Sequence, residues 1–184
     1  FATALALAGV LPCGSVHPAD PAPREILVLG GTGKLGAEIV RRLVGQGYRV
    51  TVFTRAGSDR AALAGLPVSY AEGDLLNGTD IAAAFAGRHY EVVISAVRVE
   101  NGDIHFYEKI VGPLVAAAKA AGVAQYIHHG AVGAGRNAEN FPNLGWEKVP
   151  GLLDRLRDHG VGEDILRASG VPYTIIRNTR LYPD

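Results

Sequence analysis

The sequence predicts an α/β fold in which a doubly wound parallel sheet is covered by helices. Two observations predict it. Apolar runs of three or four residues alternate with longer segments whose apolar residues recur at helical spacing. Glycines stand where the first of these runs ends and where the helical segments stop. Because parallel strands must be joined by long crossovers, this alternation favours βαβ units.

About six strands are expected, joined by right-handed crossovers in the order 3-2-1-4-5-6, which gives a three-layer Rossmann-type sheet. The strands are expected at residues 26–29, 50–53, 68–70, 92–95, 126–128 and 173–176. Helical segments are expected at residues 35–44, 81–85 and 104–121, with a last helix closing at 165–168. Residues 130–151 are rich in Gly, Asn and Pro, and their length is typical of a functional loop.

The N-terminal 23 residues differ in composition from the rest. An apolar run of small residues at 1–11 precedes a segment rich in Pro and Ala, which resembles the core of a secretory signal and its linker. The alternative is a flexible extension, so a cytoplasmic and an exported, periplasmic location both stay open. The domain itself is expected at residues 24–184, with its substrate lobe absent or cut off.

Charge and cysteine content exclude several classes of protein. Lys plus Arg and Asp plus Glu both number 18, so the chain lacks the basic balance that nucleic-acid binding requires. Cys13 is the only cysteine, which excludes an internal disulfide. After the N-terminal extension no apolar run approaches 18 residues, so no membrane-spanning segment is expected in the domain. No His, Cys and Asp cluster has the spacing of a metal site.

The strongest motif follows the first strand, where residues 30–36 read GGTGKLG and a helical segment begins. Gly30 allows a tight turn, Gly33 admits a pyrophosphate close to the backbone, and Gly36 lets the helix pack closely on the sheet. The N–H groups at the helix start then face the phosphates. Thr32, Lys34 and Leu35 complete the predicted dinucleotide-binding loop. The alternative is a structural turn that has lost its ligand.

The end of the second strand discriminates between cofactors. An acidic residue there binds the ribose of NAD, whereas this chain has Arg55, whose guanidinium suits the 2′-phosphate of NADP. Lys34 adds a second positive charge, so NADP(H) is favoured over NAD(H). A solvated loop cation is the alternative for Arg55. Further cofactor contacts are expected at the ends of the third and fourth strands: Asp74, Leu75, Ser95, Ala96 and Val97.

Asp74 is expected to accept a hydrogen bond from the adenine amino group. A turn-forming aspartate before Asn77 and Gly78 is the alternative.

Together these motifs resemble the NmrA-like family of atypical short-chain dehydrogenase/reductases. The resemblance rests on the glycine loop, Arg55, the Gly-Asp-Leu at 73–75, the segment AAAKAAGVAQYIHH at 116–129 and the closing segment 163–177. It implies an NADP(H)-binding domain, found in quinone-type reductases, other NADPH-dependent reductases and non-catalytic redox sensors. Four positions depart from the family pattern: Gly130-Ala131 replaces Ser-Ser, His159 replaces a lysine, and Asn178 replaces a proline.

The usual catalytic pair of short-chain reductases is missing, because no tyrosine is followed by a lysine four residues later. Near the expected active site the chain offers His128, His129 and Tyr107. Neighbouring strand residues point to opposite faces, so only one histidine can face the cofactor, and His129 is the predicted proton donor. The alternative is that both histidines are structural and hydrogen-bonded within the domain.

Two functions are therefore expected from different classes. The first is an NADPH-dependent oxidoreductase with a quinone or carbonyl acceptor, because the cofactor itself carries the hydride chemistry. The second is a non-catalytic NADP(H)-sensing module that binds a regulatory protein partner. A degenerate domain that no longer binds nucleotide is the third possibility, which the intact glycine loop and Arg55 oppose.

Overall fold

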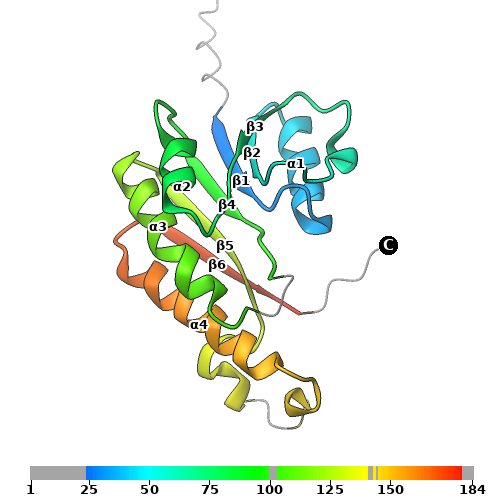
Figure 1. Ribbon diagram of the computed structural model, residues 1–184, viewed down its shortest axis with the longest axis vertical. Coiled ribbons are helices and arrows are strands. Elements are labelled where there is room, and N and C mark those ends of the chain that lie inside the picture. Colours follow the sequence, from blue (N-terminus) through cyan, green and yellow to red (C-terminus); the bar gives the residue numbers. More distant parts are fainter. Residues whose placement is uncertain (1–23, 100–102, 141–142, 144, 180–184) are drawn as a thin grey trace, which may run out of the picture.

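The computed structural model describes residues 24–99, 103–140, 143 and 145–179, and the predicted extension at 1–23 lies outside this part. Strands and helices alternate along it, as expected from the sequence (Figure 1). The strands are β1 (Glu25–Leu29), β2 (Arg49–Thr54), β3 (Val68–Glu72), β4 (Val92–Ser95), β5 (Gln125–Ala131) and β6 (Tyr173–Asn178). The α-helices are α1 (Lys34–Gly45), α2 (Gly78–Phe85), α3 (Phe106–Ala120) and α4 (Leu152–Ala168).

The six strands form one parallel sheet in the order β3-β2-β1-β4-β5-β6, which confirms the predicted topology. Strand order reverses between β1 and β4, so their carboxyl ends create the switch point where Rossmann-type folds bind ligands. Leu29 and Ser95 are the last residues of β1 and β4, and they pair with each other across the sheet. His128 on β5 pairs with Ser95 in the same row.

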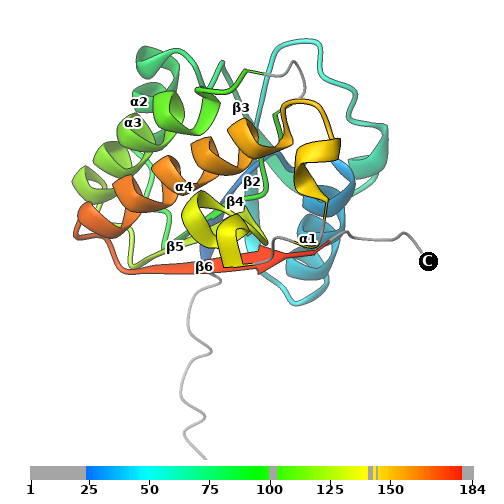
Figure 2. The ribbon, with the colours of Figure 1, turned by 90° about the horizontal axis from the view of Figure 1, so that it is seen from below.

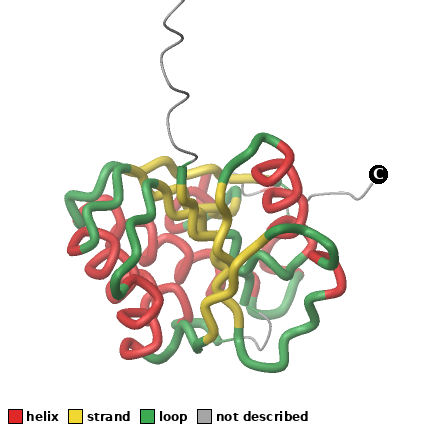
Figure 3. The backbone as a smooth tube through the Cα atoms, turned by 90° about the horizontal axis from the view of Figure 1, so that it is seen from above, coloured by secondary structure: helices red, strands yellow, loops and turns green. Residues whose placement is uncertain are grey.

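Alternate residues of β1 enter two separate cores on opposite faces of the sheet. Leu27 and Leu29 pack in a core that includes side chains of α2, α3 and α4. Ile26 and Val28 pack with side chains of α1, including Val40. Figure 2 shows α2, α3 and α4 on one face of the sheet and α1 on the other. In Figure 3 the strands accordingly run between two groups of helices.

The sequence pattern predicted only the end of helix α4 and not its full length. It begins at Leu152 and packs along α3, although only its end was expected. Two of its buried positions are glycines: a Cβ at Gly162 would lie 2.8 Å from Cβ of Tyr107 on α3, and one at Gly160 would collide with Gly135. Close helix packing therefore replaces the apolar stripe that marks most amphipathic helices.

Candidate functional site

The turn after β1 depends on glycine at both of its ends. Gly30 has φ +74°, and a Cβ there would lie 2.8 Å from the Ala96 carbonyl oxygen. A Cβ at Gly36 would collide with the Gly30 carbonyl oxygen, so α1 can approach the turn only without a side chain. These contacts give Gly30 and Gly36 the geometry that the sequence predicted for them.

Gly33 differs, because the protein itself does not require glycine there. It has an ordinary φ of −76°, and the nearest atom to a Cβ would be the Gly30 carbonyl oxygen at 3.4 Å. Gly33 is the exposed N-cap of α1, where no side chain caps the helix and no acidic residue occupies the first turn. The first N–H groups of α1 have no intrahelical partners and carry the positive end of the helix dipole. Lys34, also exposed, adds a charge beside them.

The remaining loop residues and the end of β2 surround this helix start. Thr32 and Leu35 are half-buried, and Thr54 is buried at the last position of β2. Arg55 follows as an exposed residue whose carbonyl oxygen accepts a hydrogen bond from the amide of Ser58. The predicted cation therefore lies at the carboxyl edge of the sheet, on the strand next to the glycine loop.

The predicted adenine-side residues have structural roles that the contacts make clear. One carboxylate oxygen of Asp74 accepts from the amide of Leu76 at 2.9 Å, and the amide of Asp74 donates to Asp80. Asp74 is thus a turn-forming residue, as its alternative proposed, although its side chain stays exposed. Leu75 is half-buried and packs on the core.

The end of β4 contacts the glycine loop directly. The amide of Ala96 donates to the Leu29 carbonyl at 3.0 Å, and a Cβ at Gly30 would lie 3.1 Å from Cα of Val97. Ser95 is buried, with 2% of its surface exposed. The structure therefore brings Gly30, Ala96 and Val97 together at the switch point.

Tyr107, at the start of α3, joins this strand end to α4. Its hydroxyl donates to the Val97 carbonyl oxygen at 2.8 Å. Its amide donates to a carboxylate oxygen of Asp158 on α4 at 2.8 Å, and Asp158 also accepts from the amide of Glu108. Asp158 therefore caps α3 from another helix, which satisfies two N–H groups that would otherwise lack partners. Burial raises the pKa of both Tyr107 and Asp158.

Two histidines pack around the Tyr107 ring. The His159 ring lies with its centroid 3.9 Å from that of Tyr107, and His128 meets the same ring edge-on at 5.9 Å. Both nitrogens of His128 and Nδ1 of His159 are buried and have no hydrogen-bond partner among the described residues. Burial lowers the pKa of each histidine to about 4, so both are neutral at pH 7. For His128, the alternative of a hydrogen-bonded structural histidine lacks its hydrogen bond among the described residues, and a structural role for His128 stays a prediction.

His129 lies on the opposite side of β5 from His128, because adjacent residues alternate across a strand. Its Nε2 is 2.9 Å from the Nδ2 of Asn178, so the ring nitrogen accepts the amide hydrogen. Burial lowers the pKa of this half-buried histidine too. A histidine that donates a proton must first carry it as an imidazolium. The lowered pKa and the hydrogen bond from Asn178 both favour the neutral form of His129, so they argue against the predicted donor role.

A buried ion pair fixes β5, β6 and α4 beside this cluster. Glu163 is fully buried and accepts hydrogen bonds from Arg167 at 2.8 Å and from Arg177 at 3.0 Å. The hydrogen bond to Glu163 raises the pKa of Arg177. A Cβ at Gly130 would lie 2.6 Å from Oε1 of Glu163. The space that a serine side chain would take at position 130 is thus occupied by the Glu163 carboxylate.

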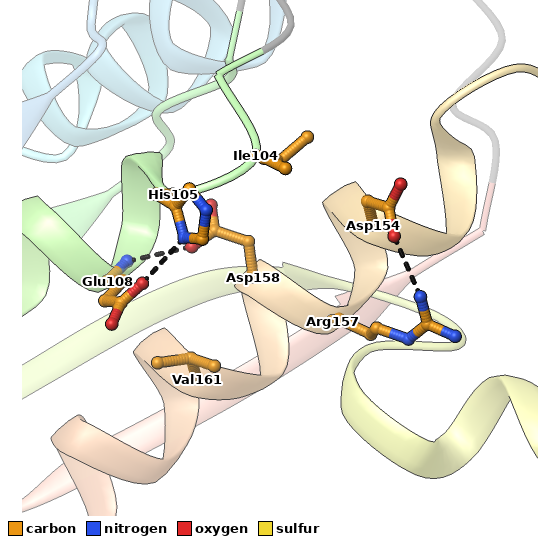
Figure 4. Close-up of a pocket in the computed structure, with 7 residues that line it drawn as sticks. All are labelled: Ile104, His105, Glu108, Asp154, Arg157, Asp158 and Val161. Carbon is orange, nitrogen blue, oxygen red and sulfur yellow. Dashed lines mark hydrogen bonds and ion pairs between the residues drawn. The ribbon is translucent and has the colours of Figure 1, made fainter.

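A separate groove on the outer side of α3 and α4 contains none of the predicted site residues (Figure 4). Its polar side chains are paired, His105 with Glu108 at 2.8 Å and Arg157 with Asp154 at 2.8 Å. Asp158 lies at its base and caps α3. Its lining residues are Ile104, His105, Glu108, Asp154, Arg157, Asp158 and Val161.

Comparison with known proteins places this geometry in a family. A family model described as NAD(P)H-binding matches residues 30–184, from the first glycine of the loop to the end of the chain. The chain belongs to this NAD(P)H-binding family. Binding of a nicotinamide dinucleotide follows from this membership, and the resemblance to the NmrA-like family agrees with it.

Proteins similar to this chain include longer ones. Sterol demethylase protein B of Methylococcus capsulatus is 39% identical over 131 residues, which cover 67% of this chain and 40% of that protein. The chain therefore spans less than half of that relative's length.

Two solved structures share the fold. ChuY, an anaerobillin reductase from Escherichia coli O157:H7, is 22% identical with a TM-score of 0.68, over 83% of this chain and 71% of its own. An NADPH-dependent quinone oxidoreductase from Escherichia coli is 21% identical with a TM-score of 0.59, over 83% of this chain and 46% of its own.

Sequence patterns did not reveal the cluster of Tyr107, His128, Asp158, His159 and Glu163, because its members come from α3, β5 and α4. One signal was available in the sequence, because His159 and Glu163 stand four residues apart and can share one face of a helix. The apolar pattern of α4 is too weak to identify that helix beforehand. Within residues 24–99, 103–140, 143 and 145–179, no group of three or more His, Cys, Asp or Glu has a metal-binding arrangement. No helix in these ranges is long and apolar enough to cross a membrane.

Proposed function

We propose that this domain binds NADP(H) across the carboxyl edge of β1, β2 and β4 and serves an NADPH-dependent reductase. The observation that carries the proposal is the open start of α1. Gly33 leaves the space beside the helix N-terminus free of a side chain, and no residue of the helix caps it. A pyrophosphate fits such a place, because unpaired N–H groups and the helix dipole favour an anion.

The preference for NADP(H) rests on charge. Arg55 directly follows β2 and Lys34 begins α1, and both are exposed at the same edge of the sheet. A 2′-phosphate between them would meet two positive groups and no acidic residue in the first turn of α1. Arg55→Ala should weaken NADPH binding at least tenfold and leave NADH binding nearly unchanged. Equal losses for both nucleotides would refute the role of Arg55.

A quinone is the acceptor class that best suits the groups at this edge. NADPH would supply the hydride, and the protein would supply position and, where needed, a proton. Tyr107 is buried, and burial holds the pKa of His128, His129 and His159 below the usual range of histidine. An alcohol product would have a pKa far above that of a phenol, comparable with water, whereas a hydroquinone is a phenol, comparable with tyrosine at about 10. The quinone therefore depends less on a protein proton donor.

The acceptor proposal is tested by following NADPH absorbance with a quinone and with a simple aldehyde. We expect oxidation of NADPH with the quinone at a rate that stays nearly constant between pH 6 and pH 8, because the buried histidines remain neutral there. His129→Gln tests the proton donor predicted from the sequence, and we expect it to retain most of the quinone rate. Faster reduction of the aldehyde, or loss of the quinone rate in His129→Gln, would contradict this acceptor class.

A non-catalytic NADP(H) sensor is the second candidate. It is favoured by the lack of a tyrosine followed by a lysine four residues later, by the departures from the family pattern at Gly130 and His159, and by the burial of Tyr107. This function predicts tight NADPH binding with no oxidation by any quinone, and a partner protein whose affinity changes when NADPH replaces NADP⁺. Turnover with a quinone would exclude it as the sole function.

A further inference from the structure

We propose that Tyr107 is a positioning residue for the nucleotide site, because its hydroxyl holds the carboxyl end of β4 against the glycine loop. The inference rests on the proposed NADP(H) site and adds to it a residue that does not touch the nucleotide. It makes the packing of α3 on α4 a determinant of cofactor affinity.

The chain of contacts is short. The Tyr107 hydroxyl donates to the Val97 carbonyl oxygen at 2.8 Å. A Cβ at Gly30 would lie 3.1 Å from Cα of Val97 and 2.8 Å from the Ala96 carbonyl oxygen, so the strand end and the turn lie too close for a side chain between them. The amide of Ala96 also donates to the carbonyl of Leu29, the residue before the turn, at 3.0 Å. A shift of Val97 toward the turn therefore displaces Gly30, which begins the proposed phosphate loop.

Tyr107 is well suited to fix the distance between Val97 and the glycine loop, because its amide, its ring and its Cβ are each in contact with neighbouring elements. Its amide is bound by Asp158, and its ring lies between His159 at 3.9 Å and His128 at 5.9 Å. Glycine at position 162 lets α4 pack against the Tyr107 Cβ. Only 1% of its surface is exposed, so the hydroxyl cannot leave Val97 for solvent without opening the α3–α4 contact.

The burial of Tyr107 also separates this role from catalysis. A phenol enclosed by α3, α4 and β5 cannot touch an acceptor at the sheet edge, and its hydroxyl hydrogen is already donated to Val97. Tyr107 therefore acts on the site through the backbone of Val97.

The experiment compares Tyr107→Phe with Tyr90→Phe, a matched control in the same core. Tyr90 is 2% exposed, and its hydroxyl also donates to a backbone carbonyl, that of Ala84 at 3.2 Å, away from the glycine loop. Each variant loses one buried hydrogen bond, so we expect similar shifts of the urea unfolding midpoint. The Kd for NADP⁺, measured by calorimetry, should rise roughly fivefold in Tyr107→Phe and stay unchanged in Tyr90→Phe.

Equal Kd values in the two variants and the wild type would overturn the inference while leaving the proposed function intact. Absence of NADP⁺ binding to the wild type would overturn both. Hydrogen–deuterium exchange of the wild type tests the inference without any variant. NADP⁺ should slow exchange in the first turn of α3 as well as at residues 30–36, and protection confined to the loop would contradict the role of Tyr107.

Discussion

Replacing His128 by phenylalanine is expected to reduce the decrease in the free energy of unfolding that occurs as the pH falls. His128 is 1% exposed, both of its ring nitrogens lack partners, and burial lowers its pKa from 6.5 to about 4. Above pH 6.5 the imidazole is neutral in both states. Below that pH the unfolded chain takes up a proton that the folded protein refuses, so folding free energy is lost as the pH falls toward 4.

The two pKa values set the size of the effect. The folded protein should lose about 2 kcal/mol through His128 between pH 8 and pH 5, and about 3 kcal/mol by pH 4. The phenyl ring introduced by His128→Phe would keep the edge-on contact with Tyr107 and remove two unpartnered nitrogens. The variant should therefore be at least as stable as the wild type at pH 8.

The assay is urea unfolding between pH 8 and pH 4, followed by fluorescence of Trp146, the only tryptophan, which is buried in the folded protein. His89→Gln is the control, because His89 is exposed and lies outside the cluster. We expect the gap between His128→Phe and the wild type to widen as the pH falls, and His89→Gln to follow the wild type. Parallel curves for His128→Phe and the wild type would refute the reasoning.

The remaining predictions concern packing and charge. Gly36→Ala should lower the free energy of unfolding by about 1 to 3 kcal/mol, because its Cβ meets the Gly30 backbone, and unchanged stability in urea would contradict this contact. Glu163→Gln should cost about 1 to 3 kcal/mol in the same urea assay, because it leaves two partly exposed arginines facing a neutral amide, and unchanged stability would contradict the ion pair. Asp158→Ala should cost about 1 to 2 kcal/mol and loosen the first turn of α3, measured by hydrogen exchange, and full protection there would contradict capping by Asp158.

Local patterns were sufficient for the sheet and for the glycine turn. Apolar runs such as that of β1 and the glycines after it depend on neighbours in the sequence, so the topology was predictable and is confirmed. The tight turn at Gly30 and the close packing at Gly36 have the expected geometry, and their contact with a cofactor stays a prediction. Asp74 shows where local patterns remain ambiguous. The same carboxylate suits a turn and an adenine contact, and only the hydrogen bond from Leu76 identifies the turn.

The histidines show what sequence reasoning could not supply. Alternation along β5 predicted that His128 and His129 face opposite sides, but the choice between them needed the partners on each side. His128 meets Tyr107 from α3, whereas His129 meets Asn178 from β6, which is 49 residues away. Similarly, Asp158 caps α3 from 51 residues away. Contacts between residues about 50 positions apart leave no periodic signal in the sequence. The cluster of Tyr107, His128, Asp158, His159 and Glu163 is therefore visible only in the folded chain.

The central claim, that the open start of α1 binds the phosphates of NADP(H), is tested most directly by calorimetric titration of the wild type and of Gly33→Val with NADPH and NADH. The wild type should bind NADPH in the micromolar range and NADH more weakly. Gly33→Val should lose NADPH binding with little change in unfolding free energy, because, apart from its chain neighbours, the nearest atom of the described residues to a Cβ there is the Gly30 carbonyl oxygen at 3.4 Å. Equal NADPH binding by Gly33→Val and the wild type, or no binding by either, would contradict the account.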